Sequence, residues 1–303
     1  MTKKTGTVRI GISGWTYASW RGQFYPEDLP QKQELSYAAP HFRSIEINGT
    51  YYSLQRPESF GRWRDETPGD FVFAVKGPRF ITHMLRLQNI ETALANFLAS
   101  GLLRLGPKLG PILWQFPPNM AFDPSLFENF LALLPHNGEA AANLARRHDG
   151  HVKGRSWIEI DGRQPIRHAL EIRHESFRSP AFIDMLRRQQ IALVCADTVK
   201  WPLLMDITAD FINCRLHGSE QLYVSGYEDE ALDIWAQRIR AWATGGEPEN
   251  ATRVLAPLAA RSRGRDVYLY FDNTDKKLRA PVDADHLSQR LADLMPRSHP
   301  KAA

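Results

Sequence analysis

The chain has 303 residues, 43% of them hydrophobic, so it can bury one large core or two smaller ones. A formal net charge of +4 is too small to indicate nucleic-acid binding by itself. Cys195 and Cys214 lie in apolar runs, which favours buried thiols in a reducing compartment over a disulfide. The start of the chain has no apolar signal segment, and no run approaches about 18 apolar residues. We therefore expect a cytoplasmic protein without a membrane span.

Eight short β-rich segments run through the chain, and the segments between most of them have helical patterns. We expect strands at 8–13, 43–48, 71–76, 111–116, 169–174, 191–197, 211–217 and 267–273. We expect helices near 34–39, 57–65, 90–103, 123–134, 180–190, 229–243 and 284–294. Strands that alternate with helices at a mean spacing of roughly 35 residues are typical of repeated βα units.

Eight βα units predict a single (β/α)8 TIM-like barrel with parallel strands, an architecture that usually takes ~250 residues. We expect this domain at 8–295, with tails at 1–7 and 296–303 and an insertion at 137–164 between the fourth and fifth strands. The alternative is an open doubly wound sheet, which needs a glycine-rich phosphate loop after the first strand. Residues 13–17 read SGWTY instead, which favours the barrel.

Polar side chains end every predicted strand, and the positions that alternate with them are apolar. They are Ser13, Glu46 with Asn48, Lys76, Gln115, Glu171 with Arg173, Asp197, Arg215 with His217, and Asp272. Alternate residues of a strand face opposite sides of the sheet, so we assign these side chains to the inner face. The carboxyl ends of barrel strands meet at one mouth, where active sites lie. The sequence therefore predicts a polar mouth at that end.

The charges at this mouth suggest acid–base chemistry on a small anion. Glu46 and Glu171 come from opposite sides of the barrel and supply two carboxylates for acid–base or glycoside chemistry, and His217 is suited to move protons. We therefore expect a hydrolase or lyase with these three residues as catalytic groups. The cations suited to hold a phosphate or carboxylate group are Lys76, Arg79, Arg173 and Arg215. Further candidates for substrate contact are Trp15, Tyr17, Asn48, Gln115, His174, Asp272 and Asn273.

Other readings of the same residues stay open. The charges would also satisfy one another as a buried lattice of ion pairs. A nucleic-acid-binding or phosphodiester-cleaving barrel would use the positive segments 76–86 and 146–155. A non-catalytic binding barrel is expected if no mouth carboxylate has a perturbed pKa.

A divalent metal is considered and not favoured, so we expect no cofactor. The residues suited to bind one are Glu46, Glu171, Asp197, His217 and Asp272. No two histidines at the strand ends have a metal-binding spacing, and the neighbouring cations would repel a metal ion.

Motifs spread over nearly the whole chain carry a resemblance to a known family. They are GISGWTY at 11–17, WRGQFYP at 20–26, IEIN at 45–48, FAVK at 73–76, QFPP at 115–118, EIRH at 171–174, RLHG at 215–218 and YFDN at 270–273. In this order they resemble the YecE-like family of bacterial and archaeal proteins of unknown function. The resemblance implies a TIM-like barrel and no known activity. The chain has Phe177 where the family often has Trp, and Asp272 where it often has Asn.

Overall fold

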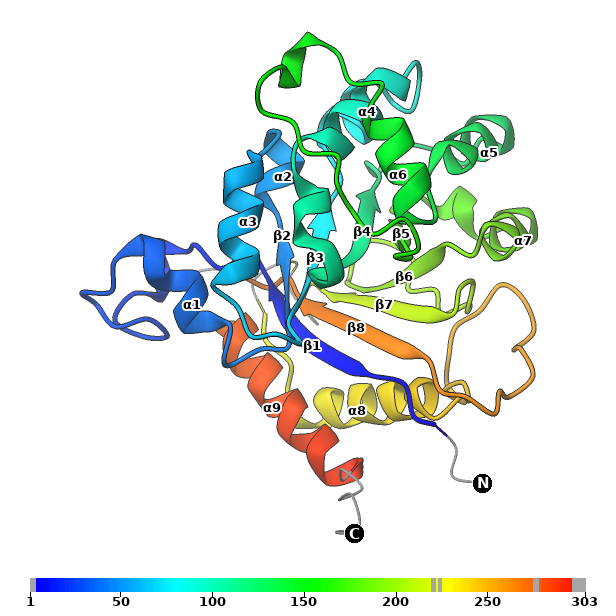
Figure 1. The fold of residues 1–303 in the computed structure, drawn as a ribbon. Coiled ribbons are helices and arrows are strands. Elements are labelled where there is room, and N and C mark those ends of the chain that lie inside the picture. The colour runs from blue at the N-terminus through cyan, green and yellow to red at the C-terminus, as the bar shows by residue number, and fades with distance from the viewer. Residues whose placement is uncertain (1–3, 219–221, 223–224, 275–277, 296–303) are drawn as a thin grey trace, which may run out of the picture.

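The structure, a computed structural model, describes residues 4–218, 222, 225–274 and 278–295. Eight parallel strands follow one another around a closed barrel, and β8 pairs with β1 (Figure 1). The strands are β1 (Val8–Ser13), β2 (Ser44–Ile47), β3 (Val72–Lys76), β4 (Leu109–Gln115), β5 (His168–Glu171), β6 (Ala192–Asp197), β7 (Phe211–Leu216) and β8 (Asp266–Phe271). The prediction of a (β/α)8 TIM-like barrel is confirmed. The predicted tail at 296–303 lies outside the described residues, as does the start of the tail at 1–7.

Helices form the outer layer of the barrel, and α8 and α9 cover β1 and β8 (Figure 1). The helices are α1 (Glu34–Ala38), α2 (Gly49–Tyr52), α3 (Pro57–Asp65), α4 (Glu91–Ala99), α5 (Pro124–Leu133), α6 (Gly138–Ala145), α7 (Pro180–Gln189), α8 (Asp229–Ala243) and α9 (Arg279–Leu294). The fully described connection 198–210 between β6 and β7 contains no helix. None of the helices in the described part of the chain is long and apolar enough to cross a membrane.

Two helices differ from the predicted bounds for local reasons. The helix expected at 90–103 ends at Ala99, because Gly101 has a φ of +117° and turns the chain into the 3-10 helix η4 (Leu102–Lys108). The last helix begins at Arg279 rather than at 284. Pro281 lies in its first turn, where the missing N–H removes no helical hydrogen bond. Proline therefore does not delay this helix.

The segment 137–164 lies between β4 and β5 and contains α6 and the 3-10 helix η5 (Gly150–Val152). The Asn137 side chain caps α6 by accepting a hydrogen bond from the Ala140 amide at 2.9 Å. Asn96 of α4 binds the segment: its Nδ2 donates to Asp149 Oδ1, and its Oδ1 accepts from the Asp149 amide, both at 3.0 Å. The segment is thereby attached to the helix layer beside α4.

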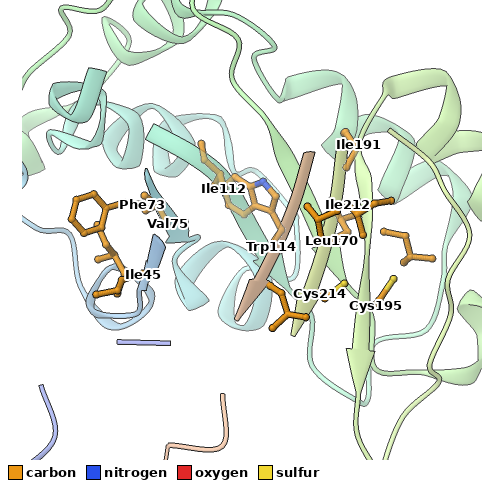
Figure 2. Packing of buried hydrophobic residues seen from close by; sticks show 14 of the residues in the cluster. Ile45, Phe73, Val75, Ile112, Trp114, Leu170, Ile191, Cys195, Ile212 and Cys214 are labelled. Carbon is orange, nitrogen blue, oxygen red and sulfur yellow. The ribbon is translucent and has the colours of Figure 1, made fainter. Parts of the chain in front are cut away.

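Two apolar layers divide the strand residues by parity. Between the strands and the helices lies a large core that includes Trp114, Leu170, Cys195 and Cys214, part of which Figure 2 shows. Both cysteines are buried and unbridged, as predicted. The barrel interior holds a second cluster: Val72, Ala74, Leu113, Ala169, Ala192, Val194, Ala196, Phe211, Tyr268 and Tyr270. The polar residues that end most strands alternate in step with these inward-facing residues, so their side chains lie at the mouth.

The strand β6 departs from the predicted parity. Ala196 faces the interior and pairs in register with Arg215 of β7, so the next residue, Asp197, has the outer parity. The Asp197 carboxylate accepts a hydrogen bond from Trp235 Nε1 of α8 at 2.9 Å. The prediction that Asp197 joins the mouth is therefore wrong.

Candidate functional site

Arg215 of β7 lies at the centre of the barrel mouth and binds carboxylates from three other strands or strand ends. Its Nη1 donates to Glu171 Oε2 at 2.5 Å, and its Nε donates to Glu46 Oε2 at 3.2 Å. Its Nη2 lies 2.9 Å from Glu46 Oε1 and 3.1 Å from Asp272 Oδ2. Every nitrogen of the guanidinium thus has a carboxylate partner. Arg215 is the centre of an ion-pair cluster, whereas the sequence suggested a clamp for a substrate anion.

Two carboxylates of this cluster, those of Glu171 and Asp272, are held in their ionised form. Burial alone would raise the pKa of Glu171, but the positive charges of Arg215 and Arg173 hold that pKa well below its usual range. Burial likewise opposes ionisation of Asp272, and Arg215 with the hydrogen bond from His217 lowers its pKa. Two mouth carboxylates therefore have perturbed pKa values, both in the direction that favours a permanent negative charge.

His217 follows β7 and lies between two of these carboxylates. Its Nδ1 is 2.9 Å from Asp272 Oδ2, and its Nε2 is 3.4 Å from Glu171 Oε2. The Trp201 ring covers it edge-on, with centroids 5.5 Å apart. Burial lowers the pKa of His217, but the charge of Glu171 and the hydrogen bonds to both carboxylates outweigh burial and raise that pKa above its usual value. The pair of His217 and Asp272 therefore favours an imidazolium and a carboxylate.

Lys76, the last residue of β3, is another cation of the mouth, and its surroundings differ from those of Arg215. Its side chain is only 9% exposed, and its ammonium lies over the Tyr51 ring, 4.5 Å from the ring centroid. Among the described residues, no carboxylate forms an ion pair with it. Burial, and then the charge of Arg215, lowers its pKa, and the more distant charges of the Asp272, Glu46 and Glu171 carboxylates oppose this shift. A buried ammonium without a fixed counter-ion is suited to accept an anion.

Arg173 and Gln115 complete the polar floor around Glu171. Arg173 Nη2 lies 2.8 Å from Glu171 Oε1, and Gln115 Nε2 donates to the same oxygen at 2.8 Å. The Arg173 guanidinium also lies over the Trp201 ring, 4.1 Å from its centroid. Arg173 is therefore fixed between a carboxylate and an aromatic face.

The structure brings eight of the predicted site residues together. Direct contacts or short-range electrostatic interactions connect Glu46, Lys76, Gln115, Glu171, Arg173, Arg215, His217 and Asp272. Tyr17 lies at the edge of this set: its hydroxyl donates to the Ser13 carbonyl at 2.5 Å, and burial raises its pKa to about 12. The side-chain oxygen of Asn48 is buried and has no hydrogen-bond partner among the described residues.

Four other predicted residues contact neighbours outside this set. Trp15 packs against Trp63, with ring centroids 5.4 Å apart, in the aromatic layer behind the strands. Asn273 donates to Asp283 Oδ2 of α9 at 2.8 Å. His174 caps the 3-10 helix η6 (Glu175–Phe177), where its Nδ1 accepts from the Ser176 amide. Arg79 is exposed, and its guanidinium lies 5.5 Å from the centroid of the Tyr52 ring.

Two aromatic residues of the mouth were missed from the sequence. Tyr51 lies in α2, just beyond the end of β2, so an aromatic residue soon after a strand end was an available signal for it. Trp201 lies in the irregular connection 198–210, which has no period that would have placed it over Arg173 and His217.

The considered metal ligands do not assemble into one site. In the described part of the chain, no three His, Cys, Asp or Glu residues are placed to hold a metal ion. Asp197 lies behind the sheet, and the Arg215 guanidinium lies between Glu46 and Glu171.

Comparisons with known proteins agree with the resemblance of the motifs. The chain is 26% identical over 252 residues to UPF0759 protein YecE of Escherichia coli, an alignment that covers 78% of this chain and 82% of YecE. It is 27% identical over 116 residues to UPF0759 protein YunF of Bacillus subtilis, which covers 37% and 40% of the two chains.

Solved structures show the same fold. The crystal structure of a DUF72 family protein from Thermotoga maritima superposes with a TM-score of 0.69 at 24% identity, covering 94% of this chain and 99% of that one. A DUF72 family protein from Enterococcus faecalis gives a TM-score of 0.65 at 16% identity, covering 94% and 95%. Residues 9–303 match the family described as "Protein of unknown function DUF72". The chain belongs to the DUF72 family.

Proposed function

We propose that the protein is a hydrolase or lyase that acts on a small substrate bearing a phosphate or carboxylate group at the barrel mouth. The observation that carries this proposal is Lys76, a nearly buried ammonium that has no carboxylate partner among the described residues. It shares the mouth with Asp272 and His217, which can exchange a proton. An anion that binds Lys76 would supply the direct ion pair that the mouth carboxylates do not form with it, and such a pair is strong where water is scarce.

Asp272 and His217 are the proton-transfer groups in this proposal. The Asp272 side chain is 12% exposed, whereas the His217 side chain behind it is fully buried. In the free protein both are held in their charged forms, so Asp272 is a weak base. A substrate anion at Lys76 adds negative charge nearby, which raises the pKa of Asp272 and of His217. The pKa of Asp272 then moves toward the range that a general base needs.

The two glutamates take a different role from the acid–base pair that the sequence suggested. Both side chains are buried, and both bind Arg215. They therefore fix Arg215 and, through it, the position of Asp272. Glu171 also favours the protonated form of His217. Glu46 and Glu171 are positioning residues in this proposal, and His217 keeps its catalytic role.

The experiment is a turnover assay with phosphomonoesters, sugar phosphates and carboxylate esters. We expect Asp272→Asn to lower kcat by about 100-fold or more, the usual contribution of a positioned acid or base. We expect Lys76→Met to raise KM. The controls are Asp70→Asn and Lys4→Met, which change exposed residues that precede β3 and β1 at the opposite end of the barrel. Full activity of the Asp272→Asn protein would overturn the assignment, and binding without turnover by the wild type would favour a binding barrel.

Nucleic-acid binding is the second candidate, because the two basic segments reach the same part of the surface. Arg79 of the segment 76–86 and His151 of the segment 146–155 line one cleft. Contacts with phosphates would make affinity for short DNA or RNA fall steeply with salt concentration. Tight, salt-dependent binding of an oligonucleotide that Lys76→Met leaves unchanged would favour this candidate over the small substrate.

A further inference from the structure

A cleft of about 560 Å³ adjoins the mouth and is not used by the proposed chemistry. Its walls come from α2, α4, the π-helix η3 (Phe80–Met84) and the segment that carries η5. Tyr51 belongs to both places, because it lines the cleft and its ring carries the Lys76 ammonium. The cleft therefore begins where the anion site of the mouth ends.

Three large apolar side chains are exposed at this cleft. Tyr52 is 67% exposed, Phe80 is 48% exposed and Met84 is 64% exposed. Single exposed apolar residues are common on proteins, but several around one concave site mark a place where a ligand or partner binds. Aromatic rings favour stacking or edge-on contact with another ring, and methionine adapts to its shape. The cleft is thus suited to a flat apolar group.

The backbone around the cleft is held in an uncommon conformation. The segment η3 is a π-helix, closed by the Leu85 amide, which donates to the Phe80 carbonyl at 2.8 Å. Just beyond it, Arg86, Leu87 and Asn89 have φ values of +50°, +67° and +52°. Such angles are unfavourable in residues other than glycine, and they occur often at ligand sites. π-helical turns also occur often at functional sites. The fold thus tolerates strain while it holds Phe80 and Met84 at the cleft.

Cations and aromatic rings alternate from the mouth into the cleft. Tyr51 lies under Lys76, and its hydroxyl is 3.1 Å from His83 Nε2, which fixes the ring. The Arg79 guanidinium then lies over the ring of Tyr52, 5.5 Å from its centroid. A ligand that extends from Lys76 past Tyr51 therefore meets positive charge first and apolar surface next.

We propose that this cleft binds a planar apolar ring of the ligand whose phosphate or carboxylate group is held by Lys76. The inference rests on the proposed function and narrows its substrate class to anions that carry such a ring. The volume supports it, because sites for small organic ligands usually measure ≈ 300–1,000 Å³. The position of Lys76 supports it as well, because its ammonium lies over the ring of Tyr51, which lines the cleft.

Calorimetric titration with three probes that carry no hydrolysable bond tests this proposal. Methylphosphonate reports the anion site alone, naphthylmethanol reports the ring site alone, and naphthylmethylphosphonate reports both. We expect the wild type to bind naphthylmethylphosphonate at least tenfold more tightly than methylphosphonate. The double variant Phe80→Ser/Met84→Ser should lose this advantage and keep its affinity for methylphosphonate. Its matched control is Ile234→Ser, which changes an apolar residue of α8 that is 45% exposed.

The outcomes separate the ring site from the anion site. Equal affinity for the two phosphonates, or an advantage that survives in the double variant, would overturn the ring site and leave the proposed function standing. The anion site would be overturned if naphthylmethanol and naphthylmethylphosphonate bound equally well and Lys76→Met changed neither affinity. That result would also contradict the inference that the ring belongs to an anionic ligand. The absence of binding by all three probes would overturn both proposals.

Discussion

Arg215 and Lys76 are both buried cations of the barrel mouth, and they differ in their surroundings. Arg215 has carboxylate partners from Glu46, Glu171 and Asp272, whereas Lys76 lies over Tyr51 and has no carboxylate partner among the described residues. A buried charge costs free energy unless it is paired. Each nitrogen of the Arg215 guanidinium has a carboxylate partner, whereas Asp272, Glu46 and Glu171 attract the Lys76 ammonium only from beyond ion-pair distance. An anion from outside can therefore still pair directly with Lys76. The comparison assigns the first cation to stability and the second to binding.

The largest expected effect is a loss of stability when Arg215, the paired cation, is replaced. Arg215→Met leaves three carboxylates close together without their shared cation. Loss of one partner of a buried ion pair usually costs 3–5 kcal/mol, so we expect the free energy of unfolding in urea to fall by about this amount. The control is Arg163→Met, because the Arg163 side chain is almost fully exposed. A loss below about 1 kcal/mol, the range of an exposed pair, would show that the cluster does not hold the mouth together.

Acid should weaken the same cluster. The pKa values of Glu171 and Asp272 are lowered in the folded protein, so their contribution to stability is present above their unfolded pKa values, about 4. That contribution is lost as the pH falls below these values. We expect the free energy of unfolding of the wild type to drop as the pH falls from roughly 5 to 3. The drop should be smaller for Asp272→Asn, and equal drops in both proteins would contradict the assignment.

Base should weaken the cluster through His217. Its pKa is raised in the folded protein, so its contribution is fully present below its unfolded pKa, about 6.5, and is lost as the pH rises through the folded pKa. We expect the stability of the wild type to decline above about pH 6.5 more than that of His217→Gln. Parallel curves for the two proteins would show that His217 is not held as an imidazolium.

The smallest expected effect on stability lies at Lys76. Lys76→Met removes a buried charge that has no carboxylate partner and keeps most of the side-chain volume. We expect the free energy of unfolding to stay within about 1 kcal/mol of the wild type or to rise, because the cost of burying an unpaired charge disappears. A loss comparable to that of Arg215→Met would mean that Lys76 also serves the fold.

The sequence was sufficient for the architecture because each strand had the right length and composition and was followed by a connection of suitable length. It also indicated that Glu46, Glu171, Arg215 and Asp272 meet at one mouth. The alternation of residues along β6 gave the wrong face for Asp197, because a strand of small apolar residues such as Ala192 and Ala196 shows no contrast between its two faces.

The roles of the mouth residues were harder to predict than their positions. Parity places Arg215 and Lys76 on the same inner face, but it does not say which cation the carboxylates surround. That choice depends on small differences in side-chain position across the barrel, which arise from how all eight strands pair. Trp201 could not be predicted as a mouth residue, because its irregular loop has no repeating pattern that indicates where its side chain points.

The most direct test of the central claim is a calorimetric titration of methylphosphonate into the wild type, Lys76→Met and Lys4→Met. The account predicts that the wild type and Lys4→Met bind alike, and that Lys76→Met binds at least tenfold more weakly while remaining folded. Equal affinity of all three proteins, or no binding by the wild type, would contradict the claim that Lys76 is the anion site of the mouth.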